Sequence, residues 1–284
     1  MNIDEAKIII DKQLEKVIYA DAGYVLNNLH PIRVIQSLKS IIGIDMDSPN
    51  EKLIQWGEEY SNGIDRLSED YFKYSIKKPK ETIVLSYLEK YILSEDHESC
   101  IRELQDLCLV SDGNQIFEYL IEFSSLHNRR ALSFIWSAYR INIFMKNKFS
   151  YQLLFLSVQS LLKNQFSGDG VMFKVDNSSV IESIKSTLLT RSVRINRNLS
   201  NCNLRDVFFN IGNSCSVEID VLTKGRYALL EYLNNLDFDK ITKELILFLD
   251  ACRMVLKNSN DYDSELANII NQVVSGGLYV KENW

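Results

Sequence analysis

The sequence has few of the residues that interrupt helices. Its 284 residues include three prolines, all within the first 79 positions, and only eleven glycines. A proline inside a helix removes a backbone hydrogen bond and clashes with the preceding turn, so its scarcity permits a long series of helices. The closely spaced turn residues and alternating apolar runs of a β-sandwich are also missing. We therefore predict an all-α protein.

The chain is slightly longer than most domains with a single core. We predict one α-helical domain over residues 1–284, built as a multi-helix array around a buried central helix. The Gly/Asp loop Ser167–Gly170 is the best internal boundary in the sequence. The alternative is therefore a division into sub-lobes 1–168 and 171–284, with a minor C-terminal lobe. Residues 171–175 fit either a short strand or an extended insertion.

Metal-binding and nucleotide-binding patterns are scarce as well. There are three histidines, and the five cysteines stand at positions 100, 108, 202, 215 and 252, without a CxxC pair or a histidine close by. This spacing indicates neither a zinc site nor a disulfide framework, and we predict no bound metal. Gly168–Gly170 lacks the lysine of a phosphate-binding loop, and no GxGxxG motif follows a predicted strand. The motifs in the sequence therefore do not identify a cofactor, which stays unknown.

The excess of acidic residues limits the classes of partner. The formal net charge is −6 and the pI is near 5.3, whereas proteins that bind nucleic acids usually carry a basic excess. The apolar segment Ala131–Phe144 is shorter than the roughly 20 residues that span a bilayer. The first thirteen residues lack the basic region and long apolar core of a secretory signal. We predict a cytoplasmic protein that binds neither nucleic acid nor membrane.

Apolar residues recur at helical spacing along most of the chain. Pro31 suits a first helical turn, and Ser48 followed by Pro49 has the order of an N-cap and a first helical residue. No repeat occurs at a fixed period, so a solenoid is not supported. The predicted helices cover residues 4–19, 31–42, 49–60, 82–93, 98–110, 116–123, 131–144, 149–166, 179–190, 218–236, 240–257 and 263–274.

The segment Ala131–Phe144 is apolar on every side of a helix. Only Ser133, Ser137, Arg140 and Asn142 interrupt it, so we predict that this helix is the buried centre of the core. Burial of Arg140 and Asn142 without partners would cost several kcal/mol. Either a structural network with nearby carboxylates satisfies them, or they point into a ligand pocket with aromatic walls, formed by Phe134, Trp136, Tyr139 and Phe144.

Four further polar features have more than one interpretation. His30 fits a helix cap or a surface position. His127, just before the central helix, fits either a polar linker or a group that faces a ligand while the neighbouring arginines receive an anion. His97 lies in an acidic loop, where we expect it to be solvated. A cluster on one side of a helix or turn is either a solvated face or an anion site; it consists of Arg191, Arg194 and Arg197.

Three segments of the sequence carry a family resemblance. Asn28–Ile32 reads NLHPI and precedes a predicted helix, Ser133–Tyr139 reads SFIWSAY, and Tyr227–Leu256 ends in ACRMVL. In this order the segments resemble the questin oxidase-like family, helical proteins whose fungal members take part in oxidative ring cleavage of anthraquinone-type polyketides. The resemblance implies an oxidoreductase of secondary metabolism, for which NADPH is one candidate electron donor. At the family's histidine positions this sequence has Leu29, Leu132 and Asp250.

These observations together predict a small-molecule site in an internal pocket. We expect the protein to bind, and if the family chemistry is retained to oxidise, an apolar or aromatic metabolite. His127 is the predicted acid-base or anchoring group, Arg140 the charge stabiliser and Tyr139 the hydrogen-bond donor. The predicted substrate-binding residues are Phe134, Trp136, Phe144 and His30. The alternative is a non-catalytic helical partner that binds another enzyme or a peptide in a biosynthetic complex.

Overall fold

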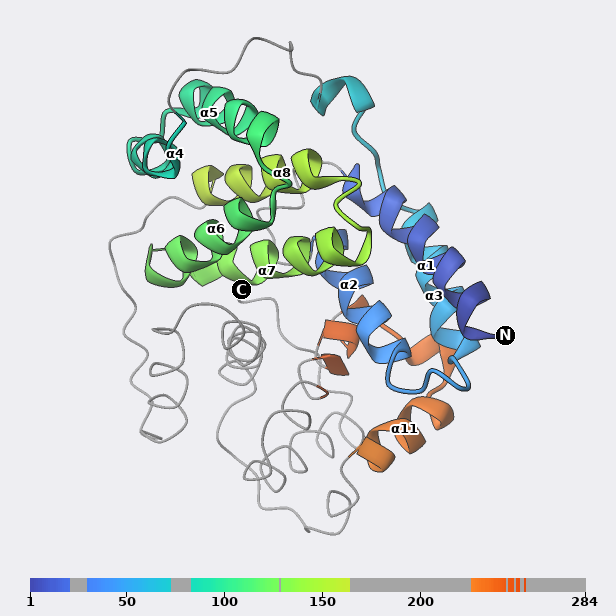
Figure 1. Ribbon diagram of the computed structural model, residues 1–284. Coiled ribbons are helices and arrows are strands. Elements are labelled where there is room, and N and C mark those ends of the chain that lie inside the picture. The colour runs from blue at the N-terminus through green and yellow to red at the C-terminus, as the bar shows by residue number, and fades with distance from the viewer. Residues whose placement is uncertain are drawn as a thin grey trace, which may run out of the picture. The chain divides into compact units, whose positions relative to one another are not determined.

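The computed structural model (Figure 1) describes residues 1–20, 30–72, 83–127, 129–163, 226–243, 245–247, 249, 250 and 253. Within these ranges the backbone forms helices and no strand, which confirms the all-α prediction. An isolated antiparallel bridge joins Ala20 to Arg66. In the same part of the chain, no helix is both long and apolar enough to cross a membrane. The predicted helices 179–190 and 263–274, segment 171–175 and the arginine cluster lie outside it.

The helices follow the segments that apolar spacing predicted. The largest difference within the described residues is the end of the sixth helix, which continues past the predicted residue 123 to His127. Ser124 lies inside this helix, and its hydroxyl donates to the carbonyl of Ile121 at 3.1 Å. The elements are α1 (Ile3–Ile18), α2 (Pro31–Ile42), α3 (Glu51–Asn62), the 3₁₀ helix η2 (Glu69–Phe72), α4 (Leu85–Leu93), α5 (His97–Val110), α6 (Asn114–His127), α7 (Arg129–Phe144), α8 (Ser150–Lys163), α11 (Arg226–Asn235) and the 3₁₀ helix η4 (Phe238–Lys240).

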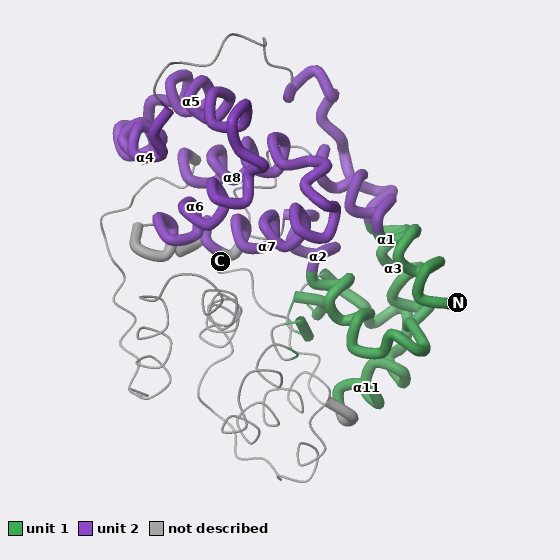
Figure 2. The backbone as a smooth tube through the Cα atoms, in the orientation of Figure 1, with its two compact units in different colours: residues 1–10, 37–60, 175–284 green, residues 11–36, 61–174 purple. Residues whose placement is uncertain are grey.

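The chain divides into two compact units, shown in different colours in Figure 2. Unit 1 comprises Met1–Ile10, Ser37–Tyr60 and Val175–Trp284, and unit 2 comprises Asp11–Gln36 and Ser61–Lys174. Each unit therefore combines stretches that are distant in the sequence, and the first three helices contribute residues to both. The boundary predicted at residues 168–171 lies outside the described residues.

Helix α7 is enclosed by neighbouring helices of unit 2. It packs on α6 and on α8, while α5 and η2 also pack on α8 and α4 packs on α5. From Ala131 to Tyr139, every side chain that the structure describes is buried. The last turn is different, because Arg140 and Phe144 are half-buried and Ile143 is 51% exposed. The predicted central helix is thus buried along most of its length and reaches the surface at its carboxyl end.

Helix α2 is enclosed more completely than its sequence indicates. All of its residues are buried except Lys39, which is half-buried. Its sequence has an apolar stripe with polar residues between. The polar side of α2 is nevertheless inside the protein, because Arg33, Gln36, Ser37 and Ser40 are each at most 9% exposed. A polar stripe therefore marks a solvent face only when no other element covers it.

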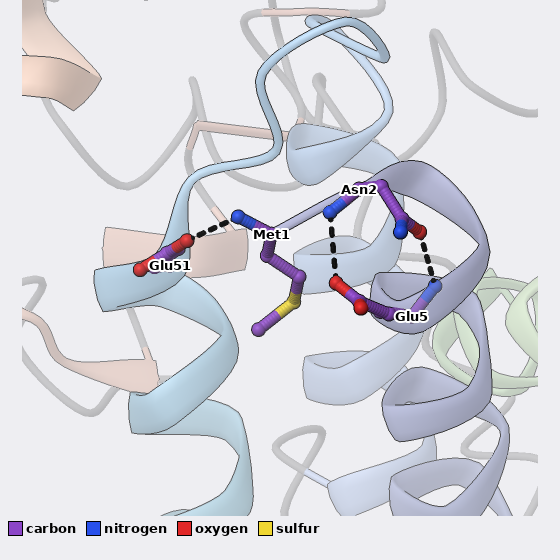
Figure 3. Close-up of polar contacts among 4 residues, drawn as sticks. All are labelled: Met1, Asn2, Glu5 and Glu51. Carbon is purple, nitrogen blue, oxygen red and sulfur yellow. Dashed lines mark hydrogen bonds and ion pairs between the residues drawn. The ribbon is translucent and has the colours of Figure 1, made fainter.

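Helix α1 begins with a reciprocal cap (Figure 3). The backbone N–H of Glu5 donates to Asn2 Oδ1 at 2.9 Å, and the backbone N–H of Asn2 donates to Glu5 Oε2 at 3.0 Å. Two backbone donors of the first turn are satisfied in this way. Beside the cap, the amino group of Met1 forms an ion pair with Glu51 at 2.5 Å, which raises the pKa of that amino group. The start of α1 therefore lies against the start of α3 within unit 1.

Asn50 caps α3 and also contacts α11. Its Oδ1 accepts from the backbone N–H of Leu53 at 3.1 Å, and its Nδ2 donates to the carbonyl of Leu233 at 3.1 Å. The sequence prediction of Ser48 as the N-cap and Pro49 as the first helical residue is therefore wrong, since α3 begins at Glu51. An asparagine amide both accepts and donates, so Asn50 satisfies groups of two helices at once.

Asn142 joins three helices of unit 2. This side chain is fully buried, and its Nδ2 donates to Asn114 Oδ1 at 3.0 Å and to Asn147 Oδ1 at 2.9 Å. Its Oδ1 accepts from the hydroxyl of Ser150 at 2.7 Å. These contacts connect the end of α7 with the first residues of α6 and α8. Of the two alternatives for Asn142, the structural network is confirmed, although its partners are amides and a hydroxyl and not carboxylates.

The turn before α6 packs tightly against this network. Gly113 has a φ of +91°, and a Cβ placed on it would lie 3.0 Å from the Cβ of Ser150. The Ser150 hydroxyl is also 3.0 Å from the carbonyl oxygen of Asp112. Both the backbone conformation and the lack of space therefore require glycine at this position. The start of α8 and the turn between α5 and α6 are held together at this point.

We expect Asn142→Leu to lower the free energy of unfolding by about 2 to 4 kcal/mol. The substitution keeps the side-chain volume but leaves several buried amide and hydroxyl groups without their partner. Urea denaturation of full-length protein measures the change. The control is Gln115→Ala, an exposed amide on α6, which should change stability by less than about 0.5 kcal/mol. A similar loss in both variants would contradict the structural role given to Asn142.

We expect Asn50→Asp to lower the free energy of unfolding by about 1 kcal/mol and Asn50→Ala to lower it by about 2 kcal/mol. Aspartate keeps the acceptor that caps α3 but loses the amide donor and brings a carboxylate to the carbonyl of Leu233. Alanine loses both contacts. Denaturant unfolding of the two variants separates the contributions. If Asn50→Asp is as stable as the unsubstituted protein, the contact with α11 does not stabilise the fold.

Candidate functional site

The aromatic residues of α7 do not share one face of the helix. Phe134 and Trp136 are two positions apart, which corresponds to a rotation of about 200° about the helix axis. Tyr139 lies about 60° from Trp136 and shares its face. The sequence had grouped Phe134, Trp136, Tyr139 and Phe144 around one pocket. The structure instead brings Trp136 together with Tyr139, and Phe134 together with His30.

His30 packs against Phe134 at the start of α2. The two ring centroids are 4.9 Å apart with an interplanar angle of 74°, and His30 is 1% exposed. Its Nδ1 accepts a hydrogen bond from the backbone N–H of Ile32 at 3.1 Å, so the capping interpretation of His30 is confirmed and a surface position is not. Since Nδ1 is the acceptor, the neutral ring carries its proton on Nε2.

The electrostatic environment keeps the His30 ring neutral. Burial lowers the pKa of His30 from the ordinary value of 6.5 to about 3, and the nearby positive charge of Arg33 acts in the same direction. A group that is neutral over the whole physiological range does not exchange protons as a general acid or base at pH 7. Near neutrality, His30 therefore acts as a neutral cap of α2.

Trp136 and Tyr139 form an aromatic group with Phe117 of α6. The ring of Tyr139 is 5.9 Å from that of Trp136 and 5.7 Å from that of Phe117. The Tyr139 hydroxyl donates to Glu118 Oε1 at 3.2 Å. Burial and the carboxylates of Glu118 and Asp112 raise the pKa of Tyr139 to about 12. The phenol therefore stays protonated at neutral pH and donates to Glu118.

The indole nitrogen of Trp136 is a buried hydrogen-bond donor without a partner. Trp136 is 3% exposed, and within the part of the chain that the structure describes no group accepts from its Nε1. A buried donor that is left unpaired costs about 1 to 3 kcal/mol, and such groups are few in folded proteins. The unpaired N–H therefore makes Trp136 an unusual residue of this core.

The Trp136 side of α7 runs from the interior to the surface. Leu132, Trp136, Tyr139 and Ile143 are spaced by four, three and four residues, so they form one stripe along the helix. Their exposed fractions are 2%, 3%, 8% and 51% in that order. We call these four residues the Trp136 stripe. Its amino-terminal part is enclosed, and its carboxyl-terminal end opens to solvent.

Of the other predicted site residues, Arg140 lies beside this stripe, and the rest lie elsewhere or outside the described residues. Arg140 is half-buried one turn beyond Trp136, and Phe144 is half-buried on another side of α7. His127 is the last residue of α6, but its side chain lies outside the described residues. His97 is exposed, as expected. Among the described residues, no three His, Cys, Asp or Glu side chains gather in a way that could hold a metal ion.

Sequence reasoning missed the residues that α6 contributes. Phe117 and Glu118 have no motif around them, and only the packing of α6 on α7 brings them to Tyr139. Asp250, which stands at a histidine position of the resembling family, is 4% exposed and forms an ion pair with Arg253 Nε at 2.9 Å. That position therefore has a structural ion pair in this protein.

The depressed pKa of His30 predicts a loss of stability in acid. Between pH 6.5 and 3 the unfolded chain binds a proton at this histidine and the folded chain does not, so stability falls as the pH falls. From pH 7 to pH 5, the protein should lose about 2 kcal/mol more unfolding free energy than His30→Asn, whose amide can still cap Ile32. Denaturant unfolding at both pH values measures this difference. Equal pH dependence in the two proteins would show that His30 is not held neutral.

The sequence and the structure were compared with known proteins. No protein-family model, no curated protein and no solved structure matches this chain. The resemblance to questin oxidase-like proteins therefore stays a prediction from the sequence, and a function has to be argued from the chemistry of the described residues.

Proposed function

We propose that this protein binds an apolar or aromatic small molecule against the Trp136 stripe. The observation that carries the proposal is the combination, on one face of α7, of enclosed aromatic rings with a buried donor that has no partner among the described residues. Small-molecule sites are mostly apolar and aromatic with a few directed polar groups. The exposed Ile143 marks the end of the stripe at which a ligand would enter.

The residues of this stripe supply binding groups and not proton transfer. The indole and phenol rings offer flat apolar surfaces on which an aromatic ligand stacks. The Trp136 N–H is a hydrogen-bond donor, whereas the single proton of the Tyr139 hydroxyl is already donated to Glu118. Donors of this kind hold and polarise an acceptor group, whereas removal of a proton needs a base. The proposal is therefore one of binding, and any oxidation of the ligand would need a redox group in addition to these side chains.

A protein partner is the second candidate function. Exposed apolar side chains favour it, since Val110 is 61%, Ile143 51% and Leu93 48% exposed on helices of unit 2. Exposed apolar residues gathered into a large patch mark interaction sites, whereas scattered ones are normal on any surface. Native mass spectrometry of protein isolated from its own host separates the two candidates, because it shows a retained small molecule or a retained protein by its mass.

Substitution at the open end of the stripe tests the binding proposal. We expect purified protein to bind 9-fluorenone, a flat aromatic probe, saturably and at one site in calorimetric titration. Ile143→Ser should weaken this binding about threefold to tenfold, because it removes apolar contact area at the entrance. It should leave thermal stability nearly unchanged, since Ile143 is half exposed. Val110→Ser, at an exposed apolar position on α5, is the matched control and should leave affinity unaltered.

A failure to bind any flat aromatic probe would remove the proposed function. Equal weakening by the two substitutions would show that the probe adheres to exposed apolar side chains in general and does not bind at the stripe.

A further inference from the structure

The chain has one Asn–Gly sequence, Asn62–Gly63, and it lies at the end of α3. Asn62 is the last residue of the helix, and both residues are exposed to solvent. Because glycine has no Cβ, its backbone nitrogen approaches the side-chain amide of the preceding residue with little steric hindrance. The two groups belong to one chain, so a reaction between them has the high effective concentration of an intramolecular step.

The position of Asn62 at a helix end permits this approach. Closure of a ring between the two groups needs the backbone of Asn62 to leave the helical conformation, and helix ends fray more easily than helix interiors. Asn50 and Asn142 are different, because their amides are bonded inside the packing of the helices and neither is followed by glycine. Asn62 is therefore the described asparagine amide best placed to react.

Lys16 of α1 holds the oxygen of this amide. Its Nζ donates to Asn62 Oδ1 at 2.5 Å. Attack on the amide carbon places negative charge on that oxygen, and a positive donor beside the oxygen stabilises the charge as it develops. The contact is exposed, so solvent screens it and its effect on the rate is a small factor.

We infer that Asn62 is a site of spontaneous deamidation, and that Lys16 promotes the reaction and pairs with its product. The backbone nitrogen of Gly63 gives its proton to water and forms a bond to Asn62 Cγ. The bond from Cγ to Nδ2 breaks, and the nitrogen takes up a proton and leaves as ammonia. Water then opens the five-membered imide, at Cγ to give aspartate or at the backbone carbonyl to give isoaspartate. In sum, an amide and water become a carboxylic acid and ammonia, without oxidation or reduction.

The aspartate product keeps the contact with Lys16. Its carboxylate occupies the place of the amide, so the hydrogen bond to the ammonium becomes an ion pair. A negative charge at the carboxyl end of a helix is unfavourable by itself, and the ion pair offsets this cost. Conversion to aspartate should therefore change the charge of the protein by one unit and leave its stability nearly unaltered.

The isoaspartate product changes the length of the main chain. It adds one carbon to the backbone just before a segment that is attached to the end of α1. In this segment Arg66 forms the bridge to Ala20, and the backbone N–H of Leu67 donates to the carbonyl of Tyr19 at 2.6 Å. A longer backbone shifts these two attachments relative to the helix, so isoaspartate should loosen the segment.

Peptide mapping by mass spectrometry tests the site. Full-length protein is kept in warm, mildly alkaline buffer for several weeks and digested with pepsin in acid, which avoids deamidation during the assay. The peptide with Asn62 should gain one mass unit at least about tenfold faster than the peptide with Asn50. Gly63→Ala should slow the reaction at least about tenfold, because its methyl group hinders the nitrogen. Among the described glycines only Gly113 has a positive φ, so alanine at position 63 needs no left-handed backbone.

A pair of charge-matched variants tests Lys16. We expect Lys16→Met to deamidate about two- to fivefold more slowly than the unsubstituted protein. Lys12→Met, at an exposed lysine one turn earlier on α1, should keep the original rate. Lys16→Arg retains a positive donor and should recover most of the rate.

Hydrogen exchange tests the effect of the two products. Ion-exchange chromatography separates the deamidated forms, and a protein isoaspartate methyltransferase labels the isoaspartate fraction. The amide of Leu67 should exchange faster in that fraction than in Asn62→Asp, whereas Asn62→Asp should exchange like the unsubstituted protein.

Each outcome bears on one part of the inference. If Asn62 stays an amide while a free peptide of residues 58–67 deamidates, the folded protein protects the site and the inference fails. Equal rates in Lys16→Met and Lys12→Met would remove the role of Lys16. Equal exchange at Leu67 in the two products would show that the added backbone carbon does not loosen the segment.

Discussion

The buried amide of Asn142 is the constraint on which the candidate site depends. Its side chain satisfies groups at the start of α6, in the turn after α7 and at the start of α8. A network of this kind rigidifies a core because each member loses a partner when the helices shift. It restrains the rotation of α7 about its axis, and in this orientation Tyr139 contacts Phe117 while Phe134, on the opposite face from Trp136, contacts His30.

Buried polar side chains in this protein differ in how many of their hydrogen-bond donors and acceptors have partners. Asn50 and Asn142 use the donor and the acceptor of their amides, and the neutral imidazole of His30 caps its own helix. These residues hold helix ends in place, which is a structural role. The indole of Trp136 is different, because the described residues leave its donor unpaired.

Much of the fold could be predicted from the sequence, and less of the site. Periodic apolar residues located the helices because burial of one side of a helix repeats every three to four residues. Local signals near helix ends were less informative, since Ser48 and Asn50 both suit an N-cap and only the contact with α11 favours Asn50. The aromatic residues of α7 were recognised as candidates, but their grouping was incomplete, because a sequence does not specify which neighbour covers each face.

By itself, the sequence determined that this chain is helical and where its described helices lie. It also determined that α7 is apolar on most of its sides. These properties follow from local composition and spacing. The tertiary structure decided the rest. It buried the polar side of α2, paired Asn142 with amides, separated Phe134 from Trp136 and brought Glu118 to Tyr139. Each of these outcomes depends on contacts between residues of different helices, and pairings of that kind leave no periodic signal in the chain.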